Sequence, residues 1–188
     1  MKPKKTEQKD DLHSRKVLNL GSGNDTYGDV RMDVIKRPNV THVGNIEKRL
    51  PFKDNTFDEV YCRQVFEHFP NPLSALLEMK RVCKKGGRIR IITDNGGCIL
   101  LHYNLKRIPH GNYSFTGREV DKRDMHYMFF QPEHLRNFFW KAGIKPTKIT
   151  LVYSDKWLGW KEFLLRKFLR LFLGKRLAYQ NIIAEAVK

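Results

Sequence analysis

Two glycines and an aspartate near the start of the chain have the residue types and spacing of a nucleoside-binding turn. Gly21, Ser22 and Gly23 directly follow an apolar run at residues 16–20. Backbone that carries almost no side chain can approach a ligand closely. Asp33 ends the next short strand, and a carboxylate at a strand tip can accept hydrogen bonds from both ribose hydroxyls. The order of strand, glycine turn, strand and aspartate indicates a site for an adenosyl cofactor, whereas the glycine turn alone is compatible with many strand ends.

Polar residues also end two later strands of the predicted sheet. Arg63 and Gln64 follow an apolar strand at 57–63, and Asp94 and Asn95 follow another at 88–93. Ligands of open α/β sheets bind outside the carboxyl ends of the strands. We therefore expect Arg63 and Gln64 to line the floor between cofactor and substrate, and Asp94 and Asn95 to face the same crevice. A simple turn is the alternative for the second pair, because two glycines follow it.

His68 is a candidate general base. It stands in the run F-E-H-F after the strand at 57–63, and the imidazole titrates near physiological pH. A histidine at such a place more often caps or packs the start of a helix, and that alternative stays open.

The elements that position these residues are predicted by the periodicity of apolar residues. Strands are expected at 16–20, 29–34, 41–44, 57–63, 88–93, 148–153 and 181–187, and helices at 72–84 and 132–142. The glycines Gly86 and Gly143 are the expected stops of the two helices. Strands that alternate with helices favour one α/β domain over residues 15–188, with an open, doubly wound and mostly parallel sheet.

The first two connections of this sheet are too short for the usual helices. Only residues 22–28 separate the first two strands, and 35–40 separate the next two. A parallel crossover with its own helix needs at least about 10–12 residues. We therefore expect the first helix to be missing or reduced to a turn. One face of that half of the sheet would then need another cover: the N-terminal tail, the late amphipathic segment or a partner subunit.

The connection at 96–131 is long enough to build a substrate pocket. Connections of this length are usually functional or disordered. It contains side chains suited to substrate contacts, namely His102, Tyr103, His110, Tyr113 and Tyr127.

The net charge of +16 is high for a chain of 188 residues. It favours an anionic partner such as nucleic acid, a phosphorylated metabolite or an acidic membrane surface, although a plain basic surface explains it equally well. Residues 1–14 are expected to form a flexible charged tail with no signal peptide. Three cysteines without a C-x-x-C pair indicate reduced thiols in a cytoplasmic protein and no metal site.

Residues 157–176 form a basic amphipathic segment. Drawn as a helix, it gathers Leu and Phe side chains on one broad face and has Arg on the other. Such helices with tryptophan often lie in a membrane interface. A lid, a cover for the exposed half of the sheet or a dimer contact is the alternative, and nucleic acid is less favoured by so apolar a segment. No run reaches the length of about 18 apolar residues that spans a membrane.

Five blocks in order make the chain resemble the class I S-adenosylmethionine-dependent methyltransferases, in particular the small type-11 group. They are VLNLGSGN, MDV, GNIEKRLPFKDNTFDEVYCRQVFEHF, LLEMKRVCKKGGRIRIIT and HYMFFQPEHLRNFFWKAGIK, and the resemblance covers roughly residues 17–143. The chain departs from the family pattern at Asn19, Asp25 and Asn45. The resemblance implies a Rossmann-like fold with one antiparallel late strand and S-adenosylmethionine as cofactor.

The resemblance also implies roles for particular residues. It gives the first motif to Asn19, Gly21, Ser22, Gly23 and Asn24, the ribose contact to Asp33 beside Val34, and the adenine contacts to Asn45 and Ile46. In the family, the segment that holds His126 folds over the crevice, so His126 would contact the substrate and is, beside His68, the second candidate catalytic residue.

Direct displacement of the methyl group needs no covalent catalyst; the enzyme chiefly aligns the reacting atoms. A general base is needed only if the acceptor must lose a proton. The methyl acceptor and the oligomeric state stay open. Three functions are compatible with the sequence: a methyltransferase for a small or lipid-like molecule near membranes, an RNA or protein methyltransferase that uses the basic surface, and a non-catalytic binding module.

Overall fold

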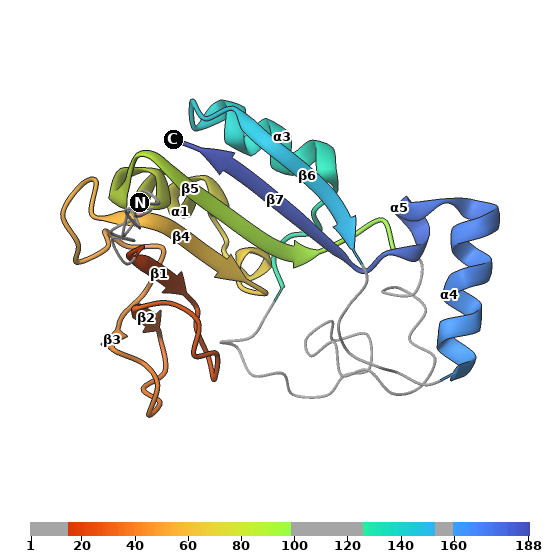
Figure 1. Ribbon diagram of the computed structural model, residues 1–188, viewed down its shortest axis with the longest axis horizontal. Helices are drawn as coiled ribbons and strands as arrows, with labels where there is room; N and C mark the ends of the chain where they lie inside the picture. The colour runs from red at the N-terminus through yellow and green to blue at the C-terminus, as the bar shows by residue number, and fades with distance from the viewer. Residues whose placement is uncertain (1–14, 99–125, 153–159) are drawn as a thin grey trace, which may run out of the picture.

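A seven-stranded sheet organises the part of the chain that the structure describes, residues 15–98, 126–152 and 160–188 of a computed structural model (Figure 1). Its spatial order is β3-β2-β1-β4-β5-β7-β6. The strands are β1 (Val17–Leu20), β2 (Val30–Asp33), β3 (His42–Val43), β4 (Phe57–Arg63), β5 (Cys83–Asp94), β6 (Pro146–Val152) and β7 (Asn181–Val187).

Strand directions confirm the predicted sheet. Strands β1 to β5 pair in parallel, while β7 runs antiparallel to both β5 and β6. Of these parallel strands, β1 is buried along its whole length and β4 along most of it, whereas the two-residue β3 at the sheet edge is exposed. Their carboxyl ends therefore meet at one edge of the sheet, where the predicted ligand residues stand.

The connections on either side of β2 contain no helix, as their lengths predicted. Side-chain hydrogen bonds support the first connection instead. Asn19 donates from Nδ2 to the carbonyl of Tyr27 (3.1 Å), and the Tyr27 hydroxyl donates to Glu59 (3.1 Å). Asp29 accepts a hydrogen bond from the amide of Val17 (2.8 Å). A loop fixed by three hydrogen bonds that involve side chains therefore takes the place of the missing helix.

Two helices, α1 (Pro72–Val82) and α3 (Pro132–Lys141), cover one face of the sheet and contact each other (Figure 1). The Asn71 side chain accepts a hydrogen bond from the amide of Ser74 and so caps α1. Between helices and sheet lies the main core, with Phe57, Phe66 and Phe139 among its largest buried side chains.

The predicted end of the first helix was wrong. Helix α1 ends at Val82, and β5 begins directly at Cys83, whereas the sequence predicted a helix to residue 84 and a strand from 88. The cause is tertiary pairing. Cys83 is extended and pairs with Phe57 of β4, and Gly86 and Gly87 hydrogen-bond with Lys188 beyond β7. The two glycines thus lie inside a strand that neighbouring strands hold on both sides.

The late amphipathic segment is two helices and not one. Helix α4 (Trp160–Leu173) ends at Gly174, whose φ of 80° suits glycine, and α5 (Lys175–Ala178) follows. Leu169 packs with Cys98, Ala178 and Tyr179 in a separate small cluster. This cluster lies at the end of the molecule opposite β1–β3 (Figure 1), so the described part of the segment does not cover the exposed half of the sheet.

Among the described residues, no helix is long and apolar enough to cross a membrane. The three cysteines are buried free thiols.

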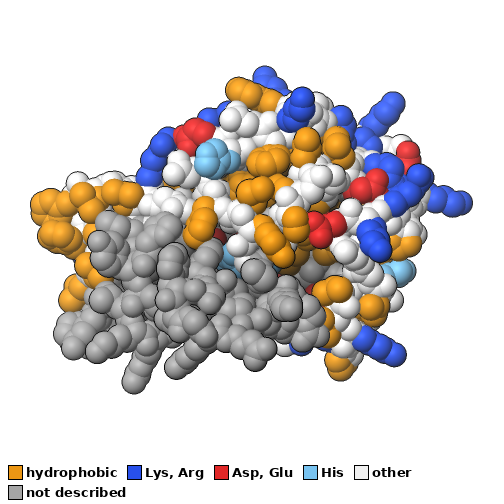
Figure 2. Space-filling view, turned by 180° about the vertical axis from the view of Figure 1, so that it is seen from behind, with side chains coloured by type: hydrophobic (Ala, Val, Ile, Leu, Met, Phe, Trp, Pro, Cys, Tyr) orange, Lys and Arg blue, Asp and Glu red, His pale blue; other side chains and the backbone are white. Residues whose placement is uncertain are grey.

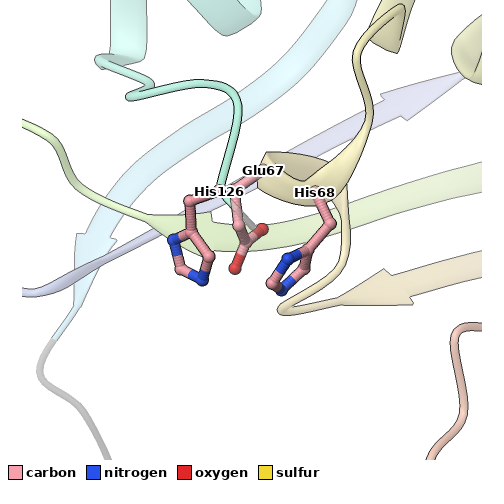
Figure 3. A group of neighbouring side chains, drawn as sticks. All are labelled: Glu67, His68 and His126. Carbon is pink, nitrogen blue, oxygen red and sulfur yellow. The ribbon is translucent and has the colours of Figure 1, made fainter. Parts of the chain in front are cut away.

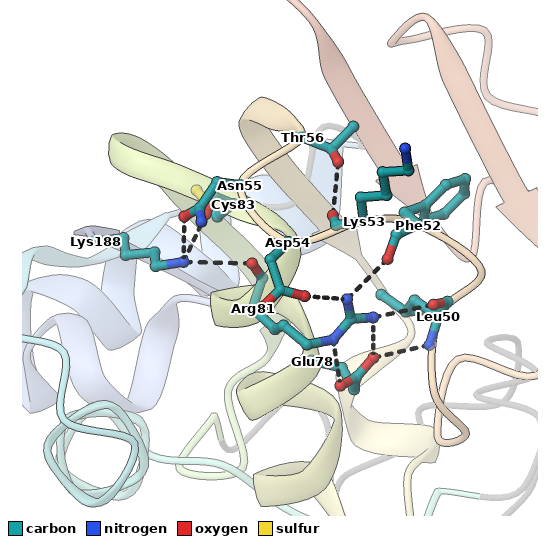
Figure 4. A network of polar contacts seen from close by, with 10 residues as sticks. All are labelled: Leu50, Phe52, Lys53, Asp54, Asn55, Thr56, Glu78, Arg81, Cys83 and Lys188. Carbon is teal, nitrogen blue, oxygen red and sulfur yellow. Dashed lines mark hydrogen bonds and ion pairs between the residues drawn. The ribbon is translucent and has the colours of Figure 1, made fainter.

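A polar network around Arg81 ties α1 to the loop before β4 (Figure 4). The guanidinium donates to both carboxylate oxygens of Glu78, to Asp54, and to the carbonyls of Leu50 and Phe52. Its hydrogen bonds hold the pKa of Glu78 below the ordinary value of 4.5. Glu78 also accepts from the amide of Leu50 at 2.8 Å.

This network predicts a pH-dependent loss of stability. Because the folded-state pKa of Glu78 is lowered, its contribution is present above about pH 4.5 and lost as the pH falls through the folded value. Glu78→Gln should lower the free energy of unfolding at pH 7 by about 1–2 kcal/mol. In denaturant unfolding, that difference from the wild type should shrink below pH 4. Glu47→Gln, which replaces a glutamate outside the Arg81 network, is the control. If the difference in unfolding free energy between Glu78→Gln and the wild type stays the same at low pH, the role of the Glu78 carboxylate is contradicted.

Candidate functional site

A cavity of about 560 Å³ opens at the carboxyl ends of β1, β2 and β4. Its volume lies in the range of small-molecule and cofactor sites, about 300–1,000 Å³. The wall comes from the ends of these strands and the loops after them: Gly21, Gly23, Asp33, Val34, Ile35, Arg37, Gly44, Asn45, Ile46, Glu47, Gln64, Val65, His68, Phe69, Pro70 and Tyr127.

The glycine turn needs glycine at position 21 for two physical reasons. Its φ is 70°, and a Cβ there would lie 2.2 Å from a methyl group of Val65. Gly23, with φ 51°, has open space where its Cβ would stand. The bare backbone at Gly23 therefore leaves part of the cavity free that a side chain would occupy.

Asp33 joins both sides of the cavity. It is buried, and its Oδ2 accepts a hydrogen bond from the amide of Gly23 (2.7 Å) while Oδ1 accepts from the amide of Ile35 (2.8 Å). A carboxylate has about four lone-pair sites. Two are used by the backbone, so acceptor capacity remains for donors of a ligand in the cavity.

The loop after β3 supplies another part of the wall. Asn45 is exposed, and its Oδ1 accepts from the amide of Glu47 (2.8 Å), which shapes the turn. Ile46 is buried and belongs to the core, and Val34 is 58 % exposed on the same wall. Apolar side chains therefore stand beside hydrogen-bonding groups here, as an aromatic base requires.

Gln64 carries a mark of ligand binding. Its φ of 53° is unusual for a residue other than glycine, and its amide nitrogen Nε2 is buried without a hydrogen-bond partner. Arg37 is also on the wall, and its Nε is likewise buried without a hydrogen-bond partner. Buried donors are normally satisfied, and strained backbone is concentrated at functional sites. A polar ligand in the cavity could satisfy both donors.

The structure brings together seven of the eleven predicted cofactor residues on the cavity wall: Gly21, Gly23, Asp33, Val34, Asn45, Ile46 and Gln64. The other four lie off it. Asn19 and Ser22 are buried, and the Asn19 amide supports the loop at Tyr27; Asn24 and Arg63 are exposed.

Several wall residues escaped the sequence prediction, among them Ile35, Arg37, Val65 and Phe69. A signal for two of them was available. Ile35 and Arg37 stand in the short connection that follows Asp33, and a connection without a helix must remain beside the carboxyl end of its strand. Val65 and Phe69 carry no such signal, because their position depends on the turn after β4.

Two histidines lie side by side at one end of the site. His68 is on the cavity wall, and its ring centroid is 4.4 Å from that of His126 in an edge-to-face arrangement. Asp94 Oδ2 lies 4.0 Å from Nδ1 of His126, and Tyr127 is on the wall. The side chain of Asn95 is engaged elsewhere: Nδ2 donates to the carbonyls of Arg176 (2.8 Å) and Tyr179 (2.7 Å). Asn95 thus fits its alternative role as a turn residue.

Tyr103, His102, His110 and Tyr113 lie outside the described residues, as does most of the predicted substrate connection at 96–131.

Comparison with known proteins identifies the fold and the domain. The family model described as "Methyltransferase domain", of the type-11 group, matches residues 23–91. An uncharacterized protein of Methanocaldococcus jannaschii is 33 % identical over 109 residues, which are 52 % of this chain and 45 % of the relative. A demethylmenaquinone methyltransferase of Shouchella clausii is 28 % identical over 135 residues, 65 % of this chain and 56 % of the relative. The chain thus spans about half the length of these relatives.

Solved structures share the whole fold. A methyltransferase described as putative from Bacillus halodurans superposes with a TM-score of 0.61 at 18 % identity, over 93 % of this chain and 92 % of that one. The predicted resemblance to class I S-adenosylmethionine-dependent methyltransferases is confirmed by this fold together with the type-11 match. The cofactor implied is S-adenosylmethionine, and the open cradle at Gly23 and the unsatisfied donor of Gln64 fit it.

The geometry predicts that Asp33 controls cofactor affinity. Asp33→Ala removes the ribose acceptor and also the anchor of the Gly23 amide. Calorimetric titration with S-adenosylmethionine and S-adenosylhomocysteine should show affinity lowered at least about tenfold, or about 1.4 kcal/mol. Asp58→Ala is the matched control, because Asp58 accepts hydrogen bonds from the backbone amide of Lys16 and the ammonium of Lys84 near the start of β4, away from the cavity. Wild-type affinity in a folded Asp33→Ala protein would refute the assignment.

Proposed function

We propose that this chain, which carries the methyltransferase domain and fold of the type-11 group, is a methyltransferase for a small or lipid-like acceptor. The observation that carries the proposal is the cavity at the carboxyl ends of β1 and β2, in which Gly23 leaves open space and Asp33 keeps acceptor capacity. S-adenosylmethionine would supply a methyl group whose bond to the positively charged sulfur breaks as the acceptor atom takes the methyl, leaving the electron pair on sulfur.

The residues of the chain would act by position. Asp33 and the Gly21–Gly23 turn would hold the nucleoside, with Asn45 and Ile46 beside its base. Such alignment of reactants is worth up to about 7–11 kcal/mol in oriented reactions. His68 lies on the wall and contacts His126, so an imidazole is available to accept a proton from an acceptor that must lose one.

An apolar, ring-containing acceptor suits the end of the site near His68. Val65, Phe69 and Tyr127 stand on the wall there, and Phe129, near Tyr127 in sequence, is 43 % exposed. Two relatives bear the name demethylmenaquinone methyltransferase, which supports a quinone-type acceptor for this chain.

Helix α4 supports a second part of the proposal, contact with an anionic membrane surface. Leu164, Phe168, Leu171 and Phe172 recur at helical spacing and are 52–77 % exposed. Figure 2 shows hydrophobic side chains gathered at this end of the molecule. Exposed cations adjoin them: Lys167, Arg170, Lys175 and Arg176. An apolar stripe bordered by cations fits the headgroup region of an acidic bilayer, so we propose that the protein acts at the cytoplasmic face of a membrane.

Two other functions follow from different observations. An RNA or protein methyltransferase would use the +16 charge and bind nucleic acid in a salt-sensitive way. A non-catalytic module would bind the cofactor without turnover. Only the first proposal uses both the apolar end of the cavity and the exposed stripe of α4.

Transfer of a radioactive methyl group tests the acceptor. With labelled S-adenosylmethionine, the wild type should label a reduced naphthoquinone with a free ring position and leave total RNA unlabelled, because Val65, Phe69 and Tyr127 make the acceptor end of the wall apolar. Asp33→Ala should lower the rate at least about tenfold, in line with 1.4 kcal/mol for each factor of ten. If RNA or protein is labelled and the quinone is not, the small-molecule proposal would be wrong. An RNA or protein methyltransferase that uses the basic surface would then be favoured. Cofactor binding without any transfer would favour the non-catalytic module.

Liposome co-sedimentation tests the membrane contact. The double variant Leu171→Glu, Phe172→Glu places two charges on the apolar stripe, and binding to vesicles with anionic lipid should fall at least about fivefold, because each residue loses burial of apolar area in the interface. Trp140→Glu is the matched control, since Trp140 is 59 % exposed on α3, outside the stripe. Equal binding of the double variant and the wild type would exclude α4 as the contact.

A further inference from the structure

Three potential metal ligands converge where the cavity meets the segment before α3. Glu67 and His68 belong to the 3-10 turn η1 (Phe66–His68) after β4, and His126 comes from a distant part of the sequence. One ligand atom of each lies within 4.8 Å of the others. Figure 3 shows the Glu67 carboxylate between the two imidazole rings. The sequence predicted no metal site, because the two parts of this cluster are brought together only by the fold.

Backbone contacts fix this convergence. The amides of Tyr127 and Met128 both donate to the carbonyl of Glu67, at 2.9 and 3.2 Å. His126 therefore directly precedes Tyr127, whose amide is hydrogen-bonded to η1. The Glu67 side chain is in turn oriented by the hydroxyl of Thr93 on β5, which donates to Oε2 at 2.7 Å. Orientation by such outer contacts is typical of metal ligands.

The donor set has a definite chemical preference. Two imidazoles and one carboxylate are typical of divalent first-row transition ions, with Zn²⁺ and Fe²⁺ as common occupants. Glu67 is 1 % exposed and His126 has a side chain that is 10 % exposed. A carboxylate buried as Glu67 is buried is normally paired or bound to a metal. Asp94, whose Oδ2 lies 4.0 Å from Nδ1 of His126, adds a further carboxylate beside the cluster.

We propose that Glu67, His68 and His126 bind one divalent first-row transition-metal ion, such as Zn²⁺. Ligand atoms on one such ion lie about 3–3.5 Å apart, given bonds of about 2.1 Å. From separations within 4.8 Å, binding requires the ligand atoms to approach one another by up to about 1.5 Å, within reach of rotations of the two rings. Three protein ligands leave an open position, as in catalytic sites of this kind.

The open position would give the ion a use in the proposed reaction, in place of proton acceptance by His68, whose ring would bind the ion. His68 also lines the cavity, so an ion bound to it lies beside the acceptor end, where it can bind an anionic oxygen of a hydroxylated ring. This role rests on the proposed methyl transfer. The binding of the ion rests only on the three ligands.

Cobalt titration of the full chain tests the site. After treatment with a chelator, the wild type should bind one equivalent of Co²⁺, with a visible absorption band of a nitrogen-ligated ion, and Zn²⁺ should displace it. Loss of a ligand should weaken Co²⁺ binding at least about tenfold in His126→Ala and in Glu67→Gln, since loss of even an outer partner costs about 10–100-fold. His42→Ala is the matched control, because His42 is exposed on β3, away from the cluster.

Calorimetric titration with S-adenosylmethionine, with and without the ion, separates this proposal from the proposed function. Binding of the cofactor by the metal-free wild type and by His126→Ala would show that these proteins are folded. Under that condition, a wild type that binds no Co²⁺, or a His126→Ala variant that binds it as tightly as the wild type, would overturn the metal site and leave the methyltransferase proposal standing. Tight Co²⁺ binding without cofactor binding would contradict the proposed function alone.

Discussion

The carboxylate of Asp33 is the constraint on which the candidate site depends. It accepts the amide of Gly23 from the turn after β1 and the amide of Ile35 from the turn after β2. One buried group thus holds two loops that lack the usual helices, and it does so at the edge where parallel strands end. Only part of the acceptor capacity of the Asp33 carboxylate is used, so the carboxylate that supports the turn can also bind a ligand. Loss of Asp33 would therefore weaken both the turn and ligand binding.

The short connections decide the character of the sheet. Side-chain hydrogen bonds support the loop before β2 in place of a helix. The Asn19 amide donates to the carbonyl of Tyr27, and the Tyr27 hydroxyl donates to the buried Glu59. On the opposite half, α1 and α3 pack on the sheet, and Arg81 joins α1 to the loop before β4. The cavity lies where the loop-supported half meets the turn after β4. Its wall therefore combines the bare backbone of Gly21, Gly23 and Gly44 with polar and apolar side chains from both halves.

The turn after β4 connects the wall of the cofactor cavity to the candidate base and metal ligands at the end of the cavity near His68. Gln64, with φ 53°, redirects the chain so that η1 presents His68 to the cavity and Glu67 to Thr93. The carbonyl of Glu67 then receives the segment that carries His126. A single strained turn thereby places cofactor wall, candidate base and candidate metal ligands together. Helix α4, whose apolar stripe is exposed, lies at the end of the molecule opposite β1–β3.

Local pattern was sufficient for much of this protein. Apolar runs that alternate with helices predicted where the strands lie along the chain, and connection length alone predicted that the helix before β2 is missing or reduced to a turn. The G-S-G turn and Asp33 marked the cavity, because residues after parallel strands must meet at one edge. The predictions failed where long-range pairing overrides local preference. Cys83 joins β5 because Phe57 pairs with it, and the side chain of Asn95 turns to the carbonyls of Arg176 and Tyr179.

The grouping of His68 with His126 depended on tertiary structure in the same way. No spacing in the chain relates residues 67 and 126; only a backbone contact between η1 and the segment before α3 brings them together. Sequence by itself determined which residues stand at strand ends, because that is a property of neighbours along the chain. Tertiary structure decided which of them share a cavity and which ligands converge, because that depends on how distant segments pack.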